Sequence, residues 1–277
     1  MDNKLIIKEI IAMKEYTALR KLLIITSITI IITCFLLPIA TVFSIAFSEG
    51  ISSYWHQIKN EEALEAIKLS LIVALIAIPI NLVFGIAASW CIAKFDFYGK
   101  SFLIALIDLP FSISPIISGF IFLSIFGIDS VLGKFLANYN IQLIFALPAI
   151  VIATLFVTLP FIARELIPLM QEHGTDQEEA AISLGASGIK TFLYITLPNI
   201  KWGLLYGLLL SLSRAFGEFG AVSVISGHIR GKTTSIPMHV EILYNEYNYV
   251  GAFAVASILA FLAIISLIIK KYFYKGK

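Results

Sequence analysis

Six long runs of apolar residues divide the chain, and a helix needs about 20 such residues to cross a bilayer core. We expect membrane spans at Leu22–Phe47, Leu64–Ala93, Ser101–Phe126, Leu143–Ala163, Trp202–Ile225 and Val250–Ile269. Prolines interrupt the second and third runs, and we expect kinks near Pro79 and near Pro110–Pro115, because neighbouring helices can satisfy the backbone groups that proline frees. The pattern predicts an all-α polytopic membrane protein, with an N-terminal segment at residues 1–21 and a six-span domain at residues 22–277.

The composition agrees with a membrane protein and excludes other classes. Of the 277 residues, 59% are hydrophobic and 14% charged, whereas a soluble domain has about 45–50% apolar and about 25% charged residues. A net charge of +2 gives no reason to expect a nucleic-acid partner. Charged residues break up the first 20 positions, so we expect no cleavable signal peptide. The histidines show no metal-ligand spacing, and we expect neither a metal site nor a catalytic residue.

The lysines and arginines of the loops predict the orientation. With a cytoplasmic N-terminus, fourteen of them fall on the cytoplasmic side and five on the other, while Arg214 lies within a span. Because basic residues are in excess in cytoplasmic loops, we expect both termini in the cytoplasm of a bacterial cell with the spans in its inner membrane.

One cytoplasmic loop, at about residues 165–201, is much longer than the others. Its first part favours a helix that begins at Thr175 or Asp176 and carries acidic residues in its first turn. Gly185 and Gly188 interrupt this helix, and Pro198 is expected to stop the next segment. The loop therefore predicts two short amphipathic helices joined by a glycine turn, which either pack on the bundle or dock a partner.

The same loop carries a long, specific signature. Glu179, Ala180 and Ala181 are followed after three residues by Gly185, and nine residues later by Ile195, Thr196, Leu197 and Pro198. This spacing resembles the EAA motif of permease subunits in ABC importers. The resemblance implies a MetI-like type I permease fold, with a coupling helix that fits a groove on an ATPase. By the same resemblance, Glu179 pairs with a basic residue there, Gly185 makes the turn, and the small alanines permit close contact.

A second glycine-rich stretch, from Gly227 to Thr233, looks like a phosphate-binding loop but does not qualify. It is one residue too short, follows a membrane span instead of a strand, and falls on the outer side. The chain has no other candidate for an ATP site. We therefore expect no cofactor in this chain, with ATP and Mg²⁺ used by a separate ATPase.

Arg214 and Glu218 stand four residues apart in the fifth expected span, on one helix face. A charge at mid-span costs at least about 2.5–3.5 kcal/mol and faces a bundle interior or a wet cavity. The pair either fixes helix packing or lines the translocation path or its gate, where Arg214 would attract an anion. Both roles are compatible.

Two further groups are candidates for the path. The hydroxyls of Ser112, Ser114 and Ser118 either line a pore or satisfy carbonyls freed by the nearby prolines. Arg230 and Lys232 lie at the outer end of the fifth span. They either pair with Glu241 or Glu246 or dock a binding protein, or they attract a dianion to an outer entrance.

The segment "RAFGEFGAVSVISGHIRGKTTSIPMHVEILYNEYNYVGAFAVAS" resembles the W-type sulfate/thiosulfate permeases, and its "GEFGA" is shared with molybdate permeases. The resemblance implies a heterodimer with a T-type permease, two copies of an ABC ATPase, and an extracytoplasmic binding protein. Molybdate, tungstate or phosphate remain alternative cargoes. An ion-coupled secondary transporter, with Arg214 and Glu218 as its coupling pair, or a structural membrane protein would leave the EAA motif unexplained.

Overall fold

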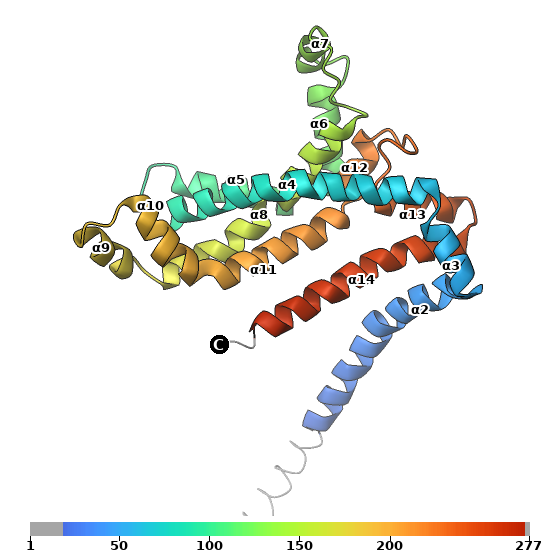
Figure 1. Cartoon of the computed structure of the whole chain (residues 1–277), viewed down its shortest axis with the longest axis horizontal. Helices are drawn as coiled ribbons and strands as arrows, with labels where there is room; N and C mark the ends of the chain where they lie inside the picture. The colour runs from blue at the N-terminus through green and yellow to red at the C-terminus, as the bar shows by residue number, and fades with distance from the viewer. Residues whose placement is uncertain (1–18, 275–277) are drawn as a thin grey trace, which may run out of the picture.

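The computed structural model describes residues 19–274, which are organised into helices and connecting turns (Figure 1). Four long helices run along the long axis of the molecule: α4 (Glu61–Lys94), α8 (Leu147–Glu172), α11 (Leu197–Phe216) and α14 (Tyr249–Tyr274). Helix α8 packs against both α4 and α11, and α11 also contacts α14. Most of the predicted N-terminal segment, residues 1–18, lies outside the described residues.

Helices α4 and α8 make the most extensive contact in the described bundle, and small and polar side chains line it. A Cβ atom on Gly85 would lie 2.6 Å from Cγ2 of Ile162, so glycine is what permits this approach. The Asn81 amide donates to Thr158 Oγ1 (2.7 Å) and to the carbonyl of Leu155 (3.1 Å). Close van der Waals packing and interhelical hydrogen bonds hold membrane helices together, since the lipid provides little hydrophobic driving force.

Within the described residues, five helices are long and apolar enough to span a membrane, and a sixth span exists if one bent pair is counted. That pair is α5 (Lys100–Ser112) and α6 (Pro115–Phe126), which meet at 109°. The third expected span is therefore not one straight helix. The break falls at Ile113 and Ser114, because the residue before a proline is pushed out of the helical conformation. Pro79 and Pro110 lie inside continuous helices.

The fifth expected span is displaced along the chain. A continuous helix starts at Gly188, in α10 (Gly188–Thr191), and runs through a π-helical turn, η2 (Phe192–Thr196), into α11. Pro198 therefore does not stop the segment, which corrects the prediction of a second short helix. The π turn ends just before this proline, with the Leu197 amide bonded to the carbonyl of Phe192. The first span, Leu19–Ala46, has a matching π turn, η1 (Ile32–Leu36), before Pro38 in α2 (Leu37–Ala46).

The same helix ends earlier than expected, at Phe216. Residues 217–219 break it, and the short α12 (Gly220–Ile225) follows. Arg214 thus lies in the last turn of α11 instead of at the middle of a span. The fourth span is longer than predicted and reaches Glu172, so the large loop shortens to about residues 173–187.

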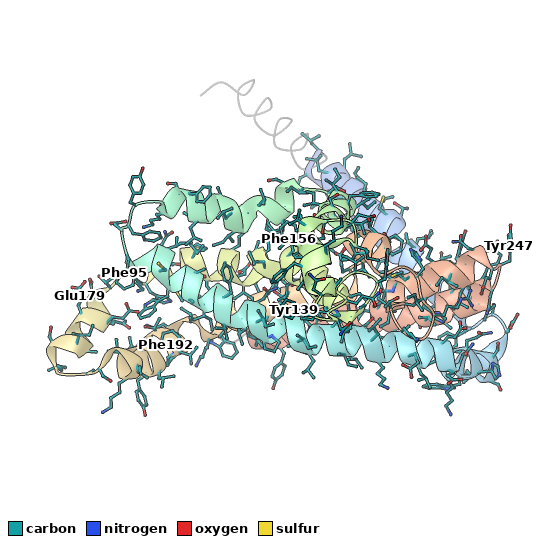
Figure 2. The ribbon with its side chains drawn as sticks, turned by 90° about the horizontal axis from the view of Figure 1, so that it is seen from above. Phe95, Tyr139, Phe156, Glu179, Phe192 and Tyr247 are labelled. Carbon is teal, nitrogen blue, oxygen red and sulfur yellow. The ribbon has the colours of Figure 1, made fainter. Side chains whose placement is uncertain are left out.

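The remaining helices lie at the two ends and on one side of the bundle. Helix α9 (Asp176–Ser183) occupies one end, while α3 (Gly50–Ile58) and α13 (Ile236–Asn245) occupy the other (Figure 1). Glu179 and Tyr247 mark these opposite ends in Figure 2. Helix α6 and the short α7 (Val131–Ala137) project sideways from the bundle.

Candidate coupling segment and membrane ion pair

Helix α9 forms where the EAA motif predicted it. It is preceded by Thr175 and has Asp176, Glu178 and Glu179 in its first turn, where carboxylates stabilise the helix dipole. The Thr175 hydroxyl donates to Glu179 Oε1 at 2.6 Å. Gly185 ends the helix with a φ of +88°, a conformation that glycine adopts without strain. The predicted glycine turn is confirmed.

The outer surface of this segment carries exposed side chains of two kinds. Glu179 and Ala180 are exposed, Ala181 is half-buried, and Leu184 and Ile189 are 90% and 75% exposed. Leu197 and Pro198 of the motif lie further along, in the first turn of α11. Exposed apolar side chains beside carboxylates are typical of a surface that binds another protein. The arrangement suits a docking element better than a loop packed only on its own bundle.

Glu178 is a residue of this segment that the motif did not single out. Its Oε2 lies 3.1 Å from Nζ of Lys94, the last residue of α4, and its Oε1 accepts from the Thr196 hydroxyl at 2.6 Å. Lys94 also donates to the carbonyl of Gly174. The sequence shows only that a glutamate stands next to the motif. It does not indicate the ion pair, because Lys94 is distant from Glu178 in the sequence.

Arg214 and Glu218 form the predicted ion pair, with Nη2 of the arginine 2.7 Å from Oε2 of the glutamate. The second carboxylate oxygen accepts from the amide of Ala221 at 2.9 Å. The Glu218 side chain is 1% exposed, whereas the Arg214 side chain is 30% exposed. The pair therefore joins α11 to α12 across the break and leaves part of the guanidinium accessible.

The break between α5 and α6 lies beside the break between α11 and α12. A Cβ atom on Gly220 would lie 2.9 Å from Cβ of Pro115, so the first turns of α12 and α6 are in contact. Ser112 and Ser114 are exposed at this point. Ser118 is buried and donates to the carbonyl of Ser114 (3.1 Å), which agrees with the alternative that its hydroxyl serves a backbone carbonyl.

The two basic residues of the outer loop have different surroundings. Arg230 pairs with Glu246, as one alternative predicted, and also with Glu62 at 3.2 Å. Its charge is therefore balanced by two carboxylates. Lys232 is exposed. Gly227 and Gly231 turn the chain in this loop, with φ of +73° and +71°.

His239 lies buried on α13 at the same end of the molecule. Its Nε2 has no hydrogen-bond partner among the described residues. Burial lowers the pKa of the imidazole; Glu62 and Glu246 oppose this effect, and Arg230 adds to it. Burial therefore favours the neutral form of the ring. No feature of the sequence pointed to this residue.

A bundle of helices with one bent pair and an exposed EAA helix defines a class, the permease subunits of ABC importers. Residues 83–277 match the family described as "Binding-protein-dependent transport system inner membrane component". The chain belongs to this family and is a multi-pass membrane protein. Members of this class are transport components, so the chain is not an enzyme.

Several known proteins are similar to this chain. The sulfate transport system permease protein CysW of Escherichia coli K12 is 46% identical over 85% of the chain and 81% of the relative. The CysT permease of Salmonella typhimurium is 32% identical over 84% of each. In the solved structure of a bacterial alginate ABC transporter, one chain has a TM-score of 0.74, with 18% identity and 94% coverage of both chains. At that identity the likeness supports the fold alone.

Proposed function

We propose that the chain is a membrane-spanning permease subunit of an ATP-driven importer of sulfate and thiosulfate. It forms the translocation path with a second, T-type permease, and α9 couples this path to a separate ATPase dimer that uses ATP and Mg²⁺. An extracytoplasmic binding protein delivers the anion. The observation that carries the coupling role is α9 itself, whose EAA residues project from the end of the bundle with Glu179 exposed.

The choice of cargo rests on the relatives. A protein 46% identical over most of its length is named a sulfate permease, and its T-type counterpart is also similar to the chain. The partly accessible guanidinium of Arg214 supports an anionic cargo, because charged residues at membrane depth face a wet cavity or a partner.

The distribution of basic residues supports a cytoplasmic location for α9 and for both termini. Lys94, Lys190 and Lys201 lie in α4, α10 and α11, at the end of the bundle that carries α9, while Lys59 and Arg230 lie near α3 and α13. The first group follows the positive-inside rule when α9 faces the cytoplasm. The opposite end, with Lys232 exposed, then receives the loaded binding protein.

Two measurements test the proposal. Uptake of labelled sulfate is measured in a strain that lacks this gene and in the same strain after complementation, with molybdate and thiosulfate as competitors. Restored uptake that thiosulfate, but not molybdate, inhibits agrees with the proposal, whereas preferential inhibition by molybdate assigns the other oxyanion. Affinity purification of the chain from membranes should recover an ABC ATPase and a second permease. Transport without any ATPase would indicate an ion-coupled secondary transporter.

A further inference from the structure

The Lys94–Glu178 ion pair lies on the inner side of α9, between this helix and the membrane spans. Only 6% of the lysine side chain and 15% of the glutamate side chain are exposed. A charge pair withdrawn from water requires good geometry and additional hydrogen bonds. Both are present: the ions are 3.1 Å apart, and Thr196 and the Gly174 carbonyl provide the additional bonds.

The atoms of this cluster come from the ends of three long helices. Lys94 is the last residue of α4, Gly174 follows the end of α8, and Thr196 is the last residue of the π turn that leads into α11. Helix α9 itself packs on α10 and η2. Asn199 adds a second link, from its amide to Gln177 Oε1 at 2.8 Å. Through Glu178 and Gln177, one short helix is tied to α4 and to the helix that contains η2 and α11, and Lys94 links this cluster to the end of α8.

The two adjacent glutamates of α9 have opposite surroundings. Glu179 is exposed, and its carboxylate accepts a hydrogen bond from Thr175, which precedes the same helix. Glu178 faces the spans and bonds residues of α4 and η2. Neighbouring positions on a helix point about 100° apart, so α9 presents one carboxylate outward and one inward. The outward group suits a partner protein, and the inward group suits a connection within the chain.

We propose that Glu178, with Lys94 and Thr196, is the joint that passes movement of α9 into the membrane helices. This inference rests on the proposed coupling function and assigns its internal connection. A movement of α9 displaces the ends of α4 and α11 together, because the ion pair fixes α9 to α4 and the Thr196 hydrogen bond fixes α9 to the start of α11. The π turn at Thr196 is a widened turn, a feature that often marks functional positions in helices. Glu178 is a positioning residue, because it acts through the spans and does not touch cargo.

The decisive variant is Glu178→Gln in the assembled transporter. It removes the charge of the inward carboxylate and keeps its size, while Asp176→Asn removes an exposed charge from the same helix as the matched control. We expect Glu178→Gln to retain the ATPase on purification, to lower sulfate uptake about tenfold per transporter, and to raise the ATP hydrolysed per anion. The control should match the wild type in all three measurements.

Two further variants separate the joint from simple misfolding. Thr196→Val leaves the ion pair in place and should reduce uptake about threefold. The exchange of charges, Lys94→Glu with Glu178→Lys, should recover part of the uptake lost in Glu178→Gln. Uptake by Glu178→Gln within twofold of the wild type, or no recovery by the exchange, would overturn the proposal. So would loss of the ATPase in parallel with uptake, because Glu178 would then serve docking.

A third test is the rate of hydrogen exchange of the α9 amides in the purified membrane protein. This rate can be measured whichever anion the transporter carries. We expect exchange about tenfold faster in Glu178→Gln than in the wild type and no change in Asp176→Asn. Unchanged exchange would refute the joint. A wild-type chain that binds no ATPase and transports no sulfate would refute the proposed function instead, while the exchange measurement would still report whether Glu178 holds α9.

Discussion

Arg214 and Glu218 connect two helices across a break: Nη2 of the arginine in the last turn of α11 lies 2.7 Å from Oε2 of the glutamate, which also caps the amide of Ala221 in α12. The first turn of α12 in turn packs on that of α6. The pair therefore sits where the break after α11 lies beside the bend between α5 and α6. This position makes it the best candidate for the predicted gate.

The first prediction concerns the purpose of this pair. Glu218→Ala should greatly reduce the amount of protein in the membrane, because removing one partner of a buried ion pair costs about 3–5 kcal/mol. Arg214→Met with Glu218→Gln should restore the amount, since no unpaired charge remains, but leave sulfate uptake about tenfold below the wild type. Immunoblots of membranes and uptake assays make the comparison. Normal sulfate uptake by the double variant would show that the pair only stabilises helix packing.

The second prediction concerns the outward glutamate of α9. Glu179→Lys should leave the two permeases together but abolish recovery of the ATPase, because the outward-facing charge is reversed while the contacts of Glu178 remain. Quantitative purification of the complex measures both partners at once. Glu172→Lys, an exposed change at the end of α8, is the control. Normal sulfate uptake by Glu179→Lys would contradict the docking role.

The third prediction separates the two basic residues of the outer loop. Lys232→Gln should lower sulfate uptake about twofold at low ionic strength and have little effect at high salt, because an exposed charge steers an anion only over a Debye length. Arg230→Gln combined with Glu246→Gln removes one charge of each sign and should leave this salt dependence unchanged. An equal loss of uptake in Lys232→Gln and in the charge-neutral double variant would show that steering by Lys232 does not explain the effect.

The fourth prediction concerns pH and His239. Burial lowers the pKa of this ring in the folded protein, whereas an unfolded chain takes up a proton near the ordinary value of about 6.5. The folded state thus binds fewer protons, so its stability is greatest above about pH 6.5 and falls as the pH drops below it. Thermal unfolding in detergent between pH 7.5 and 5.5 measures the effect.

The matching substitution is His239→Met, which should flatten this pH dependence, with His56→Gln at an exposed position of α3 as the control. An equal acid sensitivity in the wild type and in His239→Met would assign the effect to other groups.

The sequence predicted the helical bundle, the family and the coupling helix, because these follow from local patterns. The lengths of the apolar runs predict six spans, and the described part of the chain has five, or six when the bent pair α5 and α6 is counted as one span. Gly185 ends α9 as predicted, because a helix end of this kind depends only on the local backbone conformation that glycine permits. The Arg214–Glu218 pair was predicted because the two charges stand four positions apart in one apolar run, although the helix breaks between them.

Tertiary structure decided what depends on distant partners. Pro115 begins a new helix that is bent by 109° from the one before it, whereas Pro79 and Pro198 remain inside continuous helices. The positions of the prolines in the sequence do not distinguish these cases. Packing of neighbouring helices and π turns determine whether the helical backbone can continue. The sequence by itself predicted a membrane permease with a coupling motif at Glu179. Only the folded chain brings Lys94 to Glu178, since a long-range ion pair forms when packing places the ends of separate helices side by side.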